Sequence, residues 1–557
     1  MLLAISVFIP LPLFAAVPLP SSPSWTSSDN DYSTGGAFAD LNGDGWIDFI
    51  TSNGNDEAVD HNGVYMNNHG TIEAVASWRS ADSGYFGHCY VGDVNNDGLP
   101  DLAVAFLGKS DTGELTARIY RNDGGTLGPA PWWKAHDKHS SFDCCLGDVD
   151  LDGRLDLAIS AGDAYTSETD SVRIYHNNGT TFDTLPFWTA HDGTPSDAVR
   201  FCDIDNDGDL DLFVGQHGKV SMYRNNAGTL SQTPTWVAHS GVGWVLRLAL
   251  ADYDNDGYPD LAVACNGQIG DSNCIKVFHN NSGTLDTIAS FTMLRANTYS
   301  SCVAWADVNG DQYLDLTGGG WWEPAVVFEN HAGELDTTPT WSWAPANHSD
   351  LVCEAEAWGD VTNRHLASVA ESFDGDGQRK LFNLHRRPIQ FIDSVSVGAV
   401  RLPAAGFCSD PLLGYVSIAS APPSGSANVV CFYRFSNYPD LAVTNWDQTH
   451  GNYVFLNTAS GGVANQPTPL AASRFKAWPN PASGIMRIAA IGTSPTSGSM
   501  VTVCDAAGRI RCVLSDREGV WSWDGRDSKG RPVEPGVYFA KPGPAGPTLK
   551  LVRVSQR

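Results

Sequence analysis

Nine residues beginning at Asp203 place four carboxylates at fixed intervals. Side-chain oxygens stand at positions 1, 3, 5 and 9 (Asp203, Asp205, Asp207 and Asp211), and Gly208 stands at position 6. Such a loop can surround a hard divalent cation with oxygen atoms, because glycine permits the sharp turn that brings early and late positions together. All-oxygen ligation favours Ca²⁺, since Zn²⁺ and Cu²⁺ prefer nitrogen and sulfur ligands. For a single loop, an Asp- and Gly-rich turn that binds nothing is the alternative.

The same spacing occurs in six loops, whose first positions lie 49 to 55 residues apart. Turns without a ligand have no physical reason to keep oxygen-bearing side chains at four fixed offsets in every copy. We therefore predict about six Ca²⁺ sites, the sixth weaker because Gln312 replaces the glycine at position 6. The predicted ligands in the other five loops are Asp40, Asn42, Asp44 and Asp48; Asp93, Asn95, Asp97 and Asp101; Asp148, Asp150, Asp152 and Asp156; Asp252, Asp254, Asp256 and Asp260; and Asp307, Asn309, Asp311 and Asp315.

The chain is strongly acidic, with a net charge of −29 at pH 7. This charge argues against nucleic acid as the main partner, because phosphate binding requires clustered Lys and Arg. Much of the acid lies in the six loops, and six bound Ca²⁺ ions would leave a net charge of −17. The acidity is therefore mainly a metal-binding feature and secondarily a contribution to solubility.

The first twenty residues form an apolar stretch that reaches Ala15 and Ala16. We interpret residues 1–20 as a secretory signal peptide with cleavage near Ala16, although no Lys or Arg precedes the apolar run. Pro10 and Pro12, together with the short length, argue against a membrane span. No later segment is long and apolar enough to cross a bilayer, so no transmembrane segment is expected.

One unit repeats between residue 33 and about residue 460. An apolar strand enters each Asp loop, a second strand leaves it, a third ends in Asn, and a Gly-containing turn leads to a closing Trp or Phe. Four short strands per unit make one antiparallel sheet, whose faces need neighbouring units to cover them. Helical periodicity is nearly absent, so we predict an all-β chain with a β-propeller over residues 25–460. The closing residues are Trp78, Trp133, Trp188, Trp236, Phe291 and Trp341.

The second unit has Phe86-Gly87 ahead of its Asp loop and resembles the FG-GAP repeat of integrin α-subunit propellers. The other copies are similar to bacterial VCBS and FG-GAP-like repeats. The resemblance covers about residues 33–460 but lacks the full Gly-Ala-Pro ending, so it extends to the fold and the metal loop rather than to integrins as such. It implies that each metal loop joins strands one and two on the lower face, and that ligands approach the upper face.

The repeat becomes irregular in its last part. The seventh unit begins at Asp360, but Thr362 and Arg364 replace two ligands. The pattern returns in part over residues 431–460. We predict seven blades, with these last strands helping to close the ring, and eight blades as the alternative.

The net charge of the chain changes sign after a linker at residues 461–473. Residues 474–557 carry a net charge of +7, against −36 for everything before them. Their short alternating strands and turns predict a small β-sandwich. The motifs Pro-Asn-Pro, Trp-Asp-Gly-Arg-Asp and Gly-Val-Tyr-Phe resemble the C-terminal Ig-like domain related to flagellar hook-capping proteins and type IX secretion sorting domains. This resemblance implies outer-membrane secretion machinery as a partner, and a secreted or cell-surface location on a bacterium with an outer membrane.

The twelve cysteines suit an oxidising compartment without requiring one. Cys265 and Cys274 bracket a predicted hairpin, as do Cys504 and Cys512, so these two pairs are disulfide candidates. Five others lie in the strands that precede Asp loops, and we interpret them as small buried core residues rather than metal ligands. They are Cys89, Cys144, Cys145, Cys202 and Cys302.

Three histidines follow closing aromatic residues and should lie on the upper face by strand count: His136, His191 and His239. A ring of imidazoles could bind a transition metal or respond to pH. Hydrogen bonds to the backbone of a neighbouring blade explain them more simply.

The loops between strands two and three also reach the upper face, and they vary most from unit to unit. They carry Trp321, Trp322 and Trp446 beside Asn, Asp or Glu. An indole with polar neighbours suits a sugar ring, through stacking on its apolar face and hydrogen bonds to its hydroxyls. Packing of these tryptophans between blades is an equal alternative.

Catalytic motifs are absent from the sequence, which has no Gly-x-Ser-x-Gly elbow, no phosphate-binding Gly-rich loop and no His-Glu-x-x-His. Glu323, Glu354 and Glu356 lie outside the metal loops and are the remaining candidate acid/base set. We predict a non-catalytic binding or adhesion protein with an extracellular glycan or protein ligand. A carbohydrate-active enzyme, glycoside hydrolase or lyase, on the same scaffold is the alternative, and a structural envelope component is the third possibility.

Overall fold

The computed structural model forms two compact units, Met1–Ser460 and Gly461–Arg557. No helix among its described residues is long and apolar enough to span a membrane. The residues described are 17–55, 58–108, 116–162, 170–238, 241–269, 274–293, 299–347, 350–447, 449–459, 474–478, 485–491, 500–505, 509–515, 520–542 and 549–554.

The first unit contains seven four-stranded antiparallel sheets that form a closed ring. The first strand of each sheet contacts the first strand of the next, and that of the seventh sheet contacts that of the first. The seven-blade prediction is therefore confirmed. The first six blades are β2 (Ser33–Ala39), β3 (Asp48–Asn53), β4 (Gly63–Tyr65) and β5 (Trp78–Arg79); β6 (Phe86–Gly92), β7 (Asp101–Phe106), β8 (Arg118–Tyr120) and β9 (Trp133–Lys134); β10 (Cys144–Gly147), β11 (Asp156–Ile159), β12 (Arg173–Tyr175) and β13 (Trp188–Thr189); β14 (Ser196–Cys202), β15 (Asp211–Gln216), β16 (Lys219–Tyr223) and β17 (Trp236–Ala238); β18 (Trp244–Ala251), β19 (Asp260–Asn266), β20 (Cys274–Phe278) and β21 (Phe291–Thr292); and β22 (Ser300–Ala306), β23 (Asp315–Gly320), β24 (Glu323–Phe328) and β25 (Trp341–Trp343).

The seventh blade joins both ends of the propeller. Its strands are β26 (Glu356–Gly359), β34 (Asp440–Val443), β35 (Tyr453–Phe455) and, from the other end of the unit, β1 (Trp25–Thr26). Trp25 pairs with Val454, and its indole N–H donates to the carbonyl of Ile72 in the first blade (3.1 Å). The N-terminal strand thus supplies the outer strand and the seventh closing tryptophan.

Two side chains of the repeat join neighbouring blades. The closing tryptophans Trp78, Trp133 and Trp236 each donate to a carbonyl of the following blade (2.7–3.0 Å). The Asn that ends strand three donates through Nδ2 to a carbonyl in the Asp loop of the preceding blade (2.7–3.0 Å). This second bond occurs in all seven blades, from Asn67, Asn122, Asn177, Asn225, Asn280, Asn330 and Asn457.

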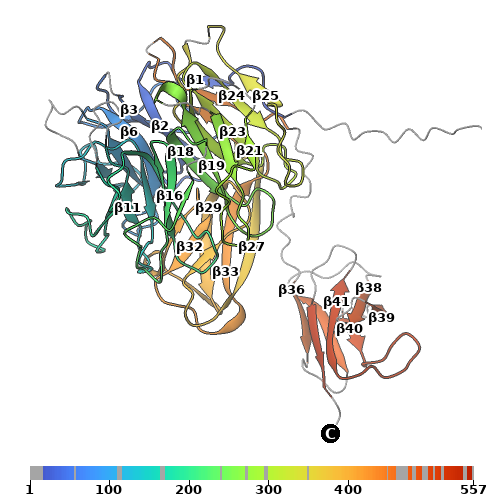
Figure 1. Cartoon of the computed structure of the whole chain (residues 1–557). Coiled ribbons are helices and arrows are strands. Elements are labelled where there is room, and N and C mark those ends of the chain that lie inside the picture. Colours follow the sequence, from blue (N-terminus) through green and yellow to red (C-terminus); the bar gives the residue numbers. More distant parts are fainter. Residues whose placement is uncertain are drawn as a thin grey trace, which may run out of the picture. The chain divides into compact units, whose positions relative to one another are not determined.

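An insertion of about eighty residues replaces the Asp loop of the seventh blade, between Asp360 and Asp440. It forms two further antiparallel sheets, which lie below the blades in Figure 1. The prediction that this region continues the repeat was wrong, because only its two ends belong to a blade. The sheets are β27 (Leu366–Gly375), β33 (Gly425–Ser436), β29 (Ile389–Val397) and β30 (Val400–Arg401), and β28 (Leu381–Asn383), β32 (Tyr415–Ile418) and β31 (Phe407–Asp410). Short 3₁₀ turns are η1 (Gly267–Ile269) in blade five and η3 (Ala404–Gly406) in the insertion.

The insertion packs against the face that carries the Asp loops. Ser417 donates to Asp148 in the third loop (2.5 Å), and Asn383 donates to Asp203 in the fourth (3.1 Å). Arg386 of the insertion donates to Gln312 in the sixth loop (2.5 Å). The insertion therefore covers part of the lower end of the central channel.

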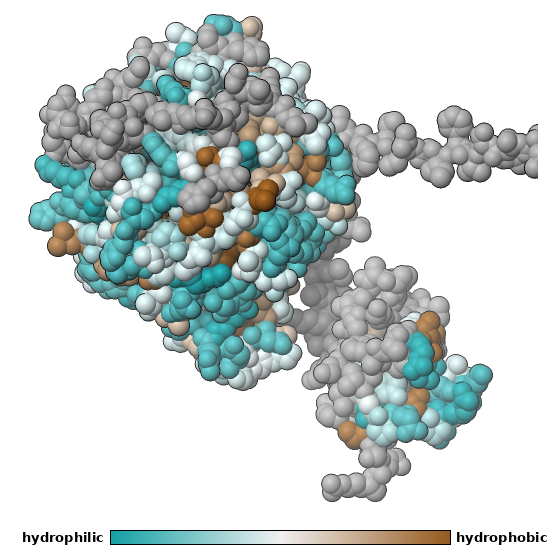
Figure 2. All heavy atoms as spheres, in the orientation of Figure 1, coloured by the Kyte–Doolittle hydropathy of each residue, from teal (hydrophilic) through white to brown (hydrophobic). Residues whose placement is uncertain are grey.

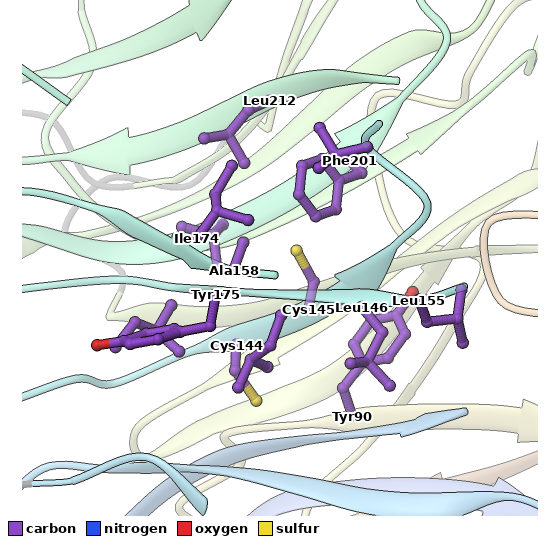
Figure 3. Packing of buried hydrophobic residues seen from close by; sticks show 14 of the residues in the cluster. Tyr90, Cys144, Cys145, Leu146, Leu155, Ala158, Ile174, Tyr175, Phe201 and Leu212 are labelled. Carbon is purple, nitrogen blue, oxygen red and sulfur yellow. The ribbon is translucent and has the colours of Figure 1, made fainter. Parts of the chain in front are cut away.

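The core of the propeller lies between adjacent blades. Figure 3 shows successive residues Cys144 and Cys145 of β10 pointing to opposite faces of their sheet, with Cys145 directed toward Phe201 of the fourth blade. Both thiols are fully buried. Gly147 leaves the space for Phe201, since a Cβ there would lie 2.5 Å from the Phe201 ring. In the view of Figure 2 the propeller surface is mostly hydrophilic, with small separate hydrophobic patches.

Residues 17–20, which fall within the expected signal peptide, pack against blades six and seven. Val17 and Leu19 are buried in a cluster with Trp341 and Phe455. The carbonyl of Pro18 accepts the amide of Thr458 (2.6 Å). Contacts of the propeller therefore begin at Val17 rather than at Trp25, and residues 1–16 lie outside the described part.

The second unit contains two antiparallel sheets. One comprises β36 (Arg474–Trp478), β37 (Met486–Ile491) and β40 (Val520–Trp523), and the other β39 (Ile510–Ser515), β38 (Met500–Asp505), β41 (Gly536–Pro542) and β42 (Leu549–Arg553). Both sheets contribute buried residues to one hydrophobic cluster, in which the rings of Trp523 and Tyr538 are 5.1 Å apart. The expected linker at 461–473 lies outside the described residues.

Candidate functional site

The turn between β23 and β24 carries two of the predicted tryptophans. Gly320 pairs with Glu323, so Trp321 and Trp322 form a two-residue hairpin turn. Trp322 has a φ of 60°, a conformation that costs a non-glycine residue about 1 kcal/mol or more. Its side chain is 45% exposed, whereas that of Trp321 is 7% exposed. The turn therefore holds one indole inside the molecule and presents the other to solvent.

The third predicted tryptophan joins the same cluster from the next blade. Trp446 lies in the connection between β34 and β35, and its indole N–H donates to Glu354 Oε1 (3.2 Å). The indole N–H of Trp321 donates to the same oxygen. One buried carboxylate thus fixes the orientation of two indoles from adjacent blades.

Blades five and six extend this aromatic cluster. The Trp321 ring lies edge-on to Trp244 of β18, with centroids 6.1 Å apart. Trp322 contacts Tyr299 edge-on at 5.6 Å. The sequence analysis missed Trp244 and Tyr299, although both stand eight residues before the first Asp of their loops, Asp252 and Asp307. Together these residues, with Trp321, Trp322, Trp446 and Glu354, form what we call the aromatic patch.

A polar group adjoins the aromatic patch on blades four and five. Asp197 accepts hydrogen bonds from the indole N–H of Trp244 and from His217 Nε2, the second at 3.1 Å. His217 is partly exposed at the turn between β15 and β16. This face therefore offers a partly exposed imidazole beside the indoles, and the buried Asp197 carboxylate orients it.

The candidate acid/base residues occupy different surroundings. Glu354 holds the indoles, and Glu323 begins β24 beside the turn. Glu356 lies deeper between blades six and seven, where it accepts a hydrogen bond from Thr317 (2.8 Å) and burial raises its pKa to about 8. Glu356 is therefore protonated at neutral pH.

Each of the six Asp loops joins strands one and two of its blade, as the resemblance implies. At position 1, Asp40 accepts the amides of Asp44 (3.1 Å) and Gly45 (2.8 Å). Asp360 in the interrupted seventh loop accepts the equivalent amides, those of Arg364 and His365. This aspartate therefore shapes the turn whether or not the other ligand residues are present.

Position 9 has an equally general structural role. In all seven blades this aspartate accepts the backbone amide of the Asn that ends strand three (2.6–2.8 Å), including Asp440 with Asn457. Burial raises the pKa of Asp440 to about 7 and that of Asp260 to about 8. The six predicted Ca²⁺ loops thus differ from the seventh at positions 3 and 5, where the seventh loop has Thr362 and Arg364.

The oxygen atoms at positions 1, 3 and 5 suit a hard cation, but basic side chains compete for them in three of the loops. In the fourth loop, Asp203 Oδ1 and Asp205 Oδ1 are buried without a hydrogen-bond partner among the described residues, a deficit that a divalent cation would satisfy. Arg224 competes there, because its Nη1 lies 2.5 Å from Asp205 Oδ2 and 3.0 Å from Asp211 Oδ2. His176 and His279 approach the third and fifth loops in the same way.

The sixth loop keeps its shape despite Gln312. This residue has a φ of 75°, close to the 87–96° of the glycines at the same position, and its amide donates to Asp307 (3.0 Å). A glutamine pays conformational strain there that glycine does not. The Gln312 side chain also accepts a hydrogen bond from Arg386 of the insertion, a contact that glycine could not make.

The predicted disulfide pairs are free thiols in the structure. Cys265 stands opposite Cys274 in the ladder between β19 and β20. A register shift places Cys504 opposite Ile510 rather than Cys512. The sulfur atoms of Cys302 and Cys353, a pair that the sequence did not indicate, lie 3.1 Å apart.

Two of the three repeated histidines are described. The backbone amides of His136 and His191 donate to carbonyls of the following blade, Thr184 (2.9 Å) and Gln232 (3.0 Å). Both side chains are exposed. The amide rather than the imidazole makes the contact between blades; His239 lies outside the described residues.

Four stretches of the chain match the FG-GAP-like repeat. They are residues 40–104, 161–214, 203–263 and 252–317. No curated protein matches the chain significantly. A solved structure of BBS1N in complex with ARL6DN is similar over 62% of this chain and 90% of its own, with 13% identity and a TM-score of 0.40. A lectin of Agrocybe aegerita, solved for its specific recognition of non-reducing terminal N-acetylglucosamine, is similar over 55% of this chain and 79% of its own, with 21% identity and a TM-score of 0.36. The matched repeats and the ring of sheets agree on an FG-GAP-like β-propeller.

Proposed function

We propose that this protein is a non-catalytic binding protein whose aromatic patch receives a sugar ring of an extracellular glycan. The observation that carries the proposal is Trp322, whose exposed indole extends from a residue with positive φ. Beside it lie two further indoles that both donate to the Glu354 carboxylate. Backbone strain of this kind concentrates at functional sites. An indole stacks on the apolar face of a sugar, and the partly exposed His217 of blade four supplies a hydrogen-bonding group for its hydroxyls.

A glycan array run with the full-length protein, alongside an assay for new reducing ends, tests this function. We expect retention of a defined set of glycans and no release of reducing ends. Retention with release would replace the proposal by a carbohydrate-active enzyme. Absence of retention on the array, combined with capture of a purified extracellular protein, would move the ligand to the protein class.

We infer a structural role for Ca²⁺ in the Asp loops. Positions 1, 3 and 5 of loops one and two, with Asp40, Asn42 and Asp44 as the first set, supply the oxygen ligands that Ca²⁺ prefers. A bound ion would tie the first two strands of a blade and offset the repulsion among clustered carboxylates. Metal that binds only the folded chain stabilises it by mass action.

Arg224→Ala is expected to strengthen Ca²⁺ binding at the fourth loop. The substitution removes the guanidinium that pairs with Asp205 and Asp211, so an incoming ion no longer has to displace it. Isothermal titration should show one class of sites with an affinity raised by roughly tenfold, the equivalent of about 1.4 kcal/mol. Arg121→Ala, which removes a guanidinium paired with exposed Asp123, is the matched control. Identical titrations for wild type and Arg224→Ala would contradict the competition.

We further propose that an N-terminal leader and the C-terminal unit serve export and surface delivery. The burial of Val17 supports cleavage after Ala16, because the remaining segment is needed inside the propeller. We expect the exported protein to begin at Val17 on N-terminal sequencing. A chain ending near Ser473 should keep the propeller fold and its ligand binding but fail to reach the surface of a host with a type IX exporter. Normal surface display of that truncated chain would refute the delivery role.

A further inference from the structure

A chamber of about 520 Å³ lies in the lower half of the central channel. Its wall is formed by inner strands of the blades, among them β2, β6, β18, β22 and β26, and its lower end by residues 387–393 and 407–413 of the insertion. The lining reaches exposed Leu412 and Gly98, so the chamber meets solvent between the insertion and the second Asp loop. This volume is in the range of small-molecule sites.

Two arginines of the chamber share one carboxylate. Arg200 donates to Asp143 Oδ2 (2.6 Å) and Arg247 to Asp143 Oδ1 (3.0 Å), and all three side chains are buried. His88 adjoins the same carboxylate at 3.4 Å, but burial lowers its pKa to about 4, so it is neutral at neutral pH. The cluster therefore carries one uncompensated positive charge.

A third arginine enters the chamber from the insertion. Arg387 forms no hydrogen bond or ion pair with another residue that the structure describes, and burial lowers its pKa. Gly414 leaves room for its guanidinium, since a Cβ there would lie 2.8–2.9 Å from it. The nearby carboxylate of Asp410 is occupied by the hydroxyl of Tyr90 (2.7 Å) and by two backbone amides. This partly buried guanidinium is therefore left available to the acceptor atoms of an anionic ligand.

The other acidic residues around the chamber form no ion pair with Arg387 in the described part of the chain. Glu356 is protonated at neutral pH, since burial raises its pKa to about 8. Asp393 is paired with Arg434 (3.1 Å). At the mouth, Asp40 and Asp93 direct their oxygens to the amides of their own loops. Arg387 is therefore the one arginine of the chamber without a carboxylate partner among the described residues.

We propose that this chamber binds a compact anion, a dicarboxylate or a tetrahedral oxyanion, between Arg387 and the Arg200–Arg247 pair. The planar guanidinium fork matches both kinds of anion, which can accept two parallel hydrogen bonds from it. The insertion supplies Arg387 and covers part of the lower end of the channel, so it acts as a wall of the binding site. This site is separate from the aromatic patch and does not depend on the glycan proposal.

Thermal unfolding and titration calorimetry of the full-length protein at constant Ca²⁺ test the proposal. The probes are succinate and sulfate, each compared with chloride at equal ionic strength. We expect one of them to raise the melting temperature with increasing concentration, and its identity distinguishes the carboxylate from the oxyanion. If neither succinate nor sulfate stabilises the protein beyond chloride, the proposal is overturned.

Arg387→Gln is expected to weaken binding of the effective probe by at least tenfold. Arg401→Gln, which removes the same charge from an exposed position of the same insertion, should change the affinity by less than twofold. Equal affinities for wild type and Arg387→Gln would overturn the assignment. If Arg387→Gln does not fold, Arg387→Lys replaces it, because lysine keeps the positive charge but lacks the planar guanidinium. An affinity lowered by threefold or more supports the site, and an unchanged affinity overturns it.

Discussion

Chelation of Ca²⁺ is expected to lower the melting temperature of the full-length protein by about 4–12 °C. Extracellular Ca²⁺ sites have dissociation constants of roughly 10⁻⁴ to 10⁻³ M, so at about 2 mM free ion each site contributes about 0.6–1.8 kcal/mol. The Asp loops occur in six of the seven blades, and their contributions act on one closed ring. Differential scanning calorimetry with and without excess chelator measures the change.

A variant in a solvent-facing loop isolates one site. Asp97 stands at position 5 of the second loop, where its oxygens accept only groups of that loop. Asp97→Asn should lower the Ca²⁺ stoichiometry by one and reduce the chelator-sensitive part of the melting temperature. Asp123→Asn, an exposed carboxylate outside the loops, controls for the loss of charge. A melt that excess chelator leaves unchanged would show that the loops do not use Ca²⁺ for stability.

Trp321→Ala is expected to destabilise the propeller by about 3–5 kcal/mol, the usual cost of replacing a large buried aromatic side chain by alanine. The indole is 7% exposed, packs against Trp244 of the fifth blade and donates to Glu354. Its removal leaves a cavity between blades and takes one donor from a buried carboxylate. Chemical denaturation with Ca²⁺ held constant measures the loss.

Trp322→Ala is the matched comparison, because it removes the same side chain from the next position of the same turn. Its indole is 45% exposed, so we expect a stability change below about 1 kcal/mol. Equal destabilisation by the two substitutions would mean that both indoles serve packing between blades.

The propeller could be predicted from the sequence because the motifs that define a blade lie close together in the chain and recur in each unit. The Asp loop, the Asn that ends strand three and the closing Trp each recur within one unit, and each has a defined contact in the structure. Trp25 is a closing tryptophan like Trp78, and its indole N–H also donates to the following blade. Its strand has only two residues, which is too short to be recognised from sequence alone. Seven-blade closure by the N-terminal strand was therefore missed.

The insertion could not be predicted because it separates two halves of one loop by about eighty residues. Asp360 and Asp440 occupy positions 1 and 9 of the seventh loop, and both keep the hydrogen bonds of those positions. A search for fixed offsets cannot join them. The presence of Arg387 in one chamber with Arg200 and Arg247 is likewise a consequence of long-range packing, as is the contact of Glu354 with two indoles.

The recurring Asp pattern corresponds to turns between strands one and two of each blade, and its role as a set of Ca²⁺ ligands stays a prediction. The structural duties of positions 1 and 9 appear even in the seventh blade, which has Thr362 and Arg364 at positions 3 and 5. Recurrence of an aspartate therefore did not by itself distinguish a ligand from a turn-forming residue. Positions 3 and 5 carry that distinction, together with the basic side chains that approach them.

Affinity measurements on Trp322→Ala test the central claim most directly. A glycan retained on the array is titrated against wild type, Trp322→Ala and Phe187→Ala, the last being an exposed aromatic residue of the third blade. We expect Trp322→Ala to weaken binding by roughly 5- to 150-fold, the equivalent of about 1–3 kcal/mol for a stacked ring. Its Ca²⁺ content should be unchanged. Phe187→Ala should bind as wild type does. An unaltered dissociation constant for Trp322→Ala would contradict the assignment of the aromatic patch as the glycan-binding face.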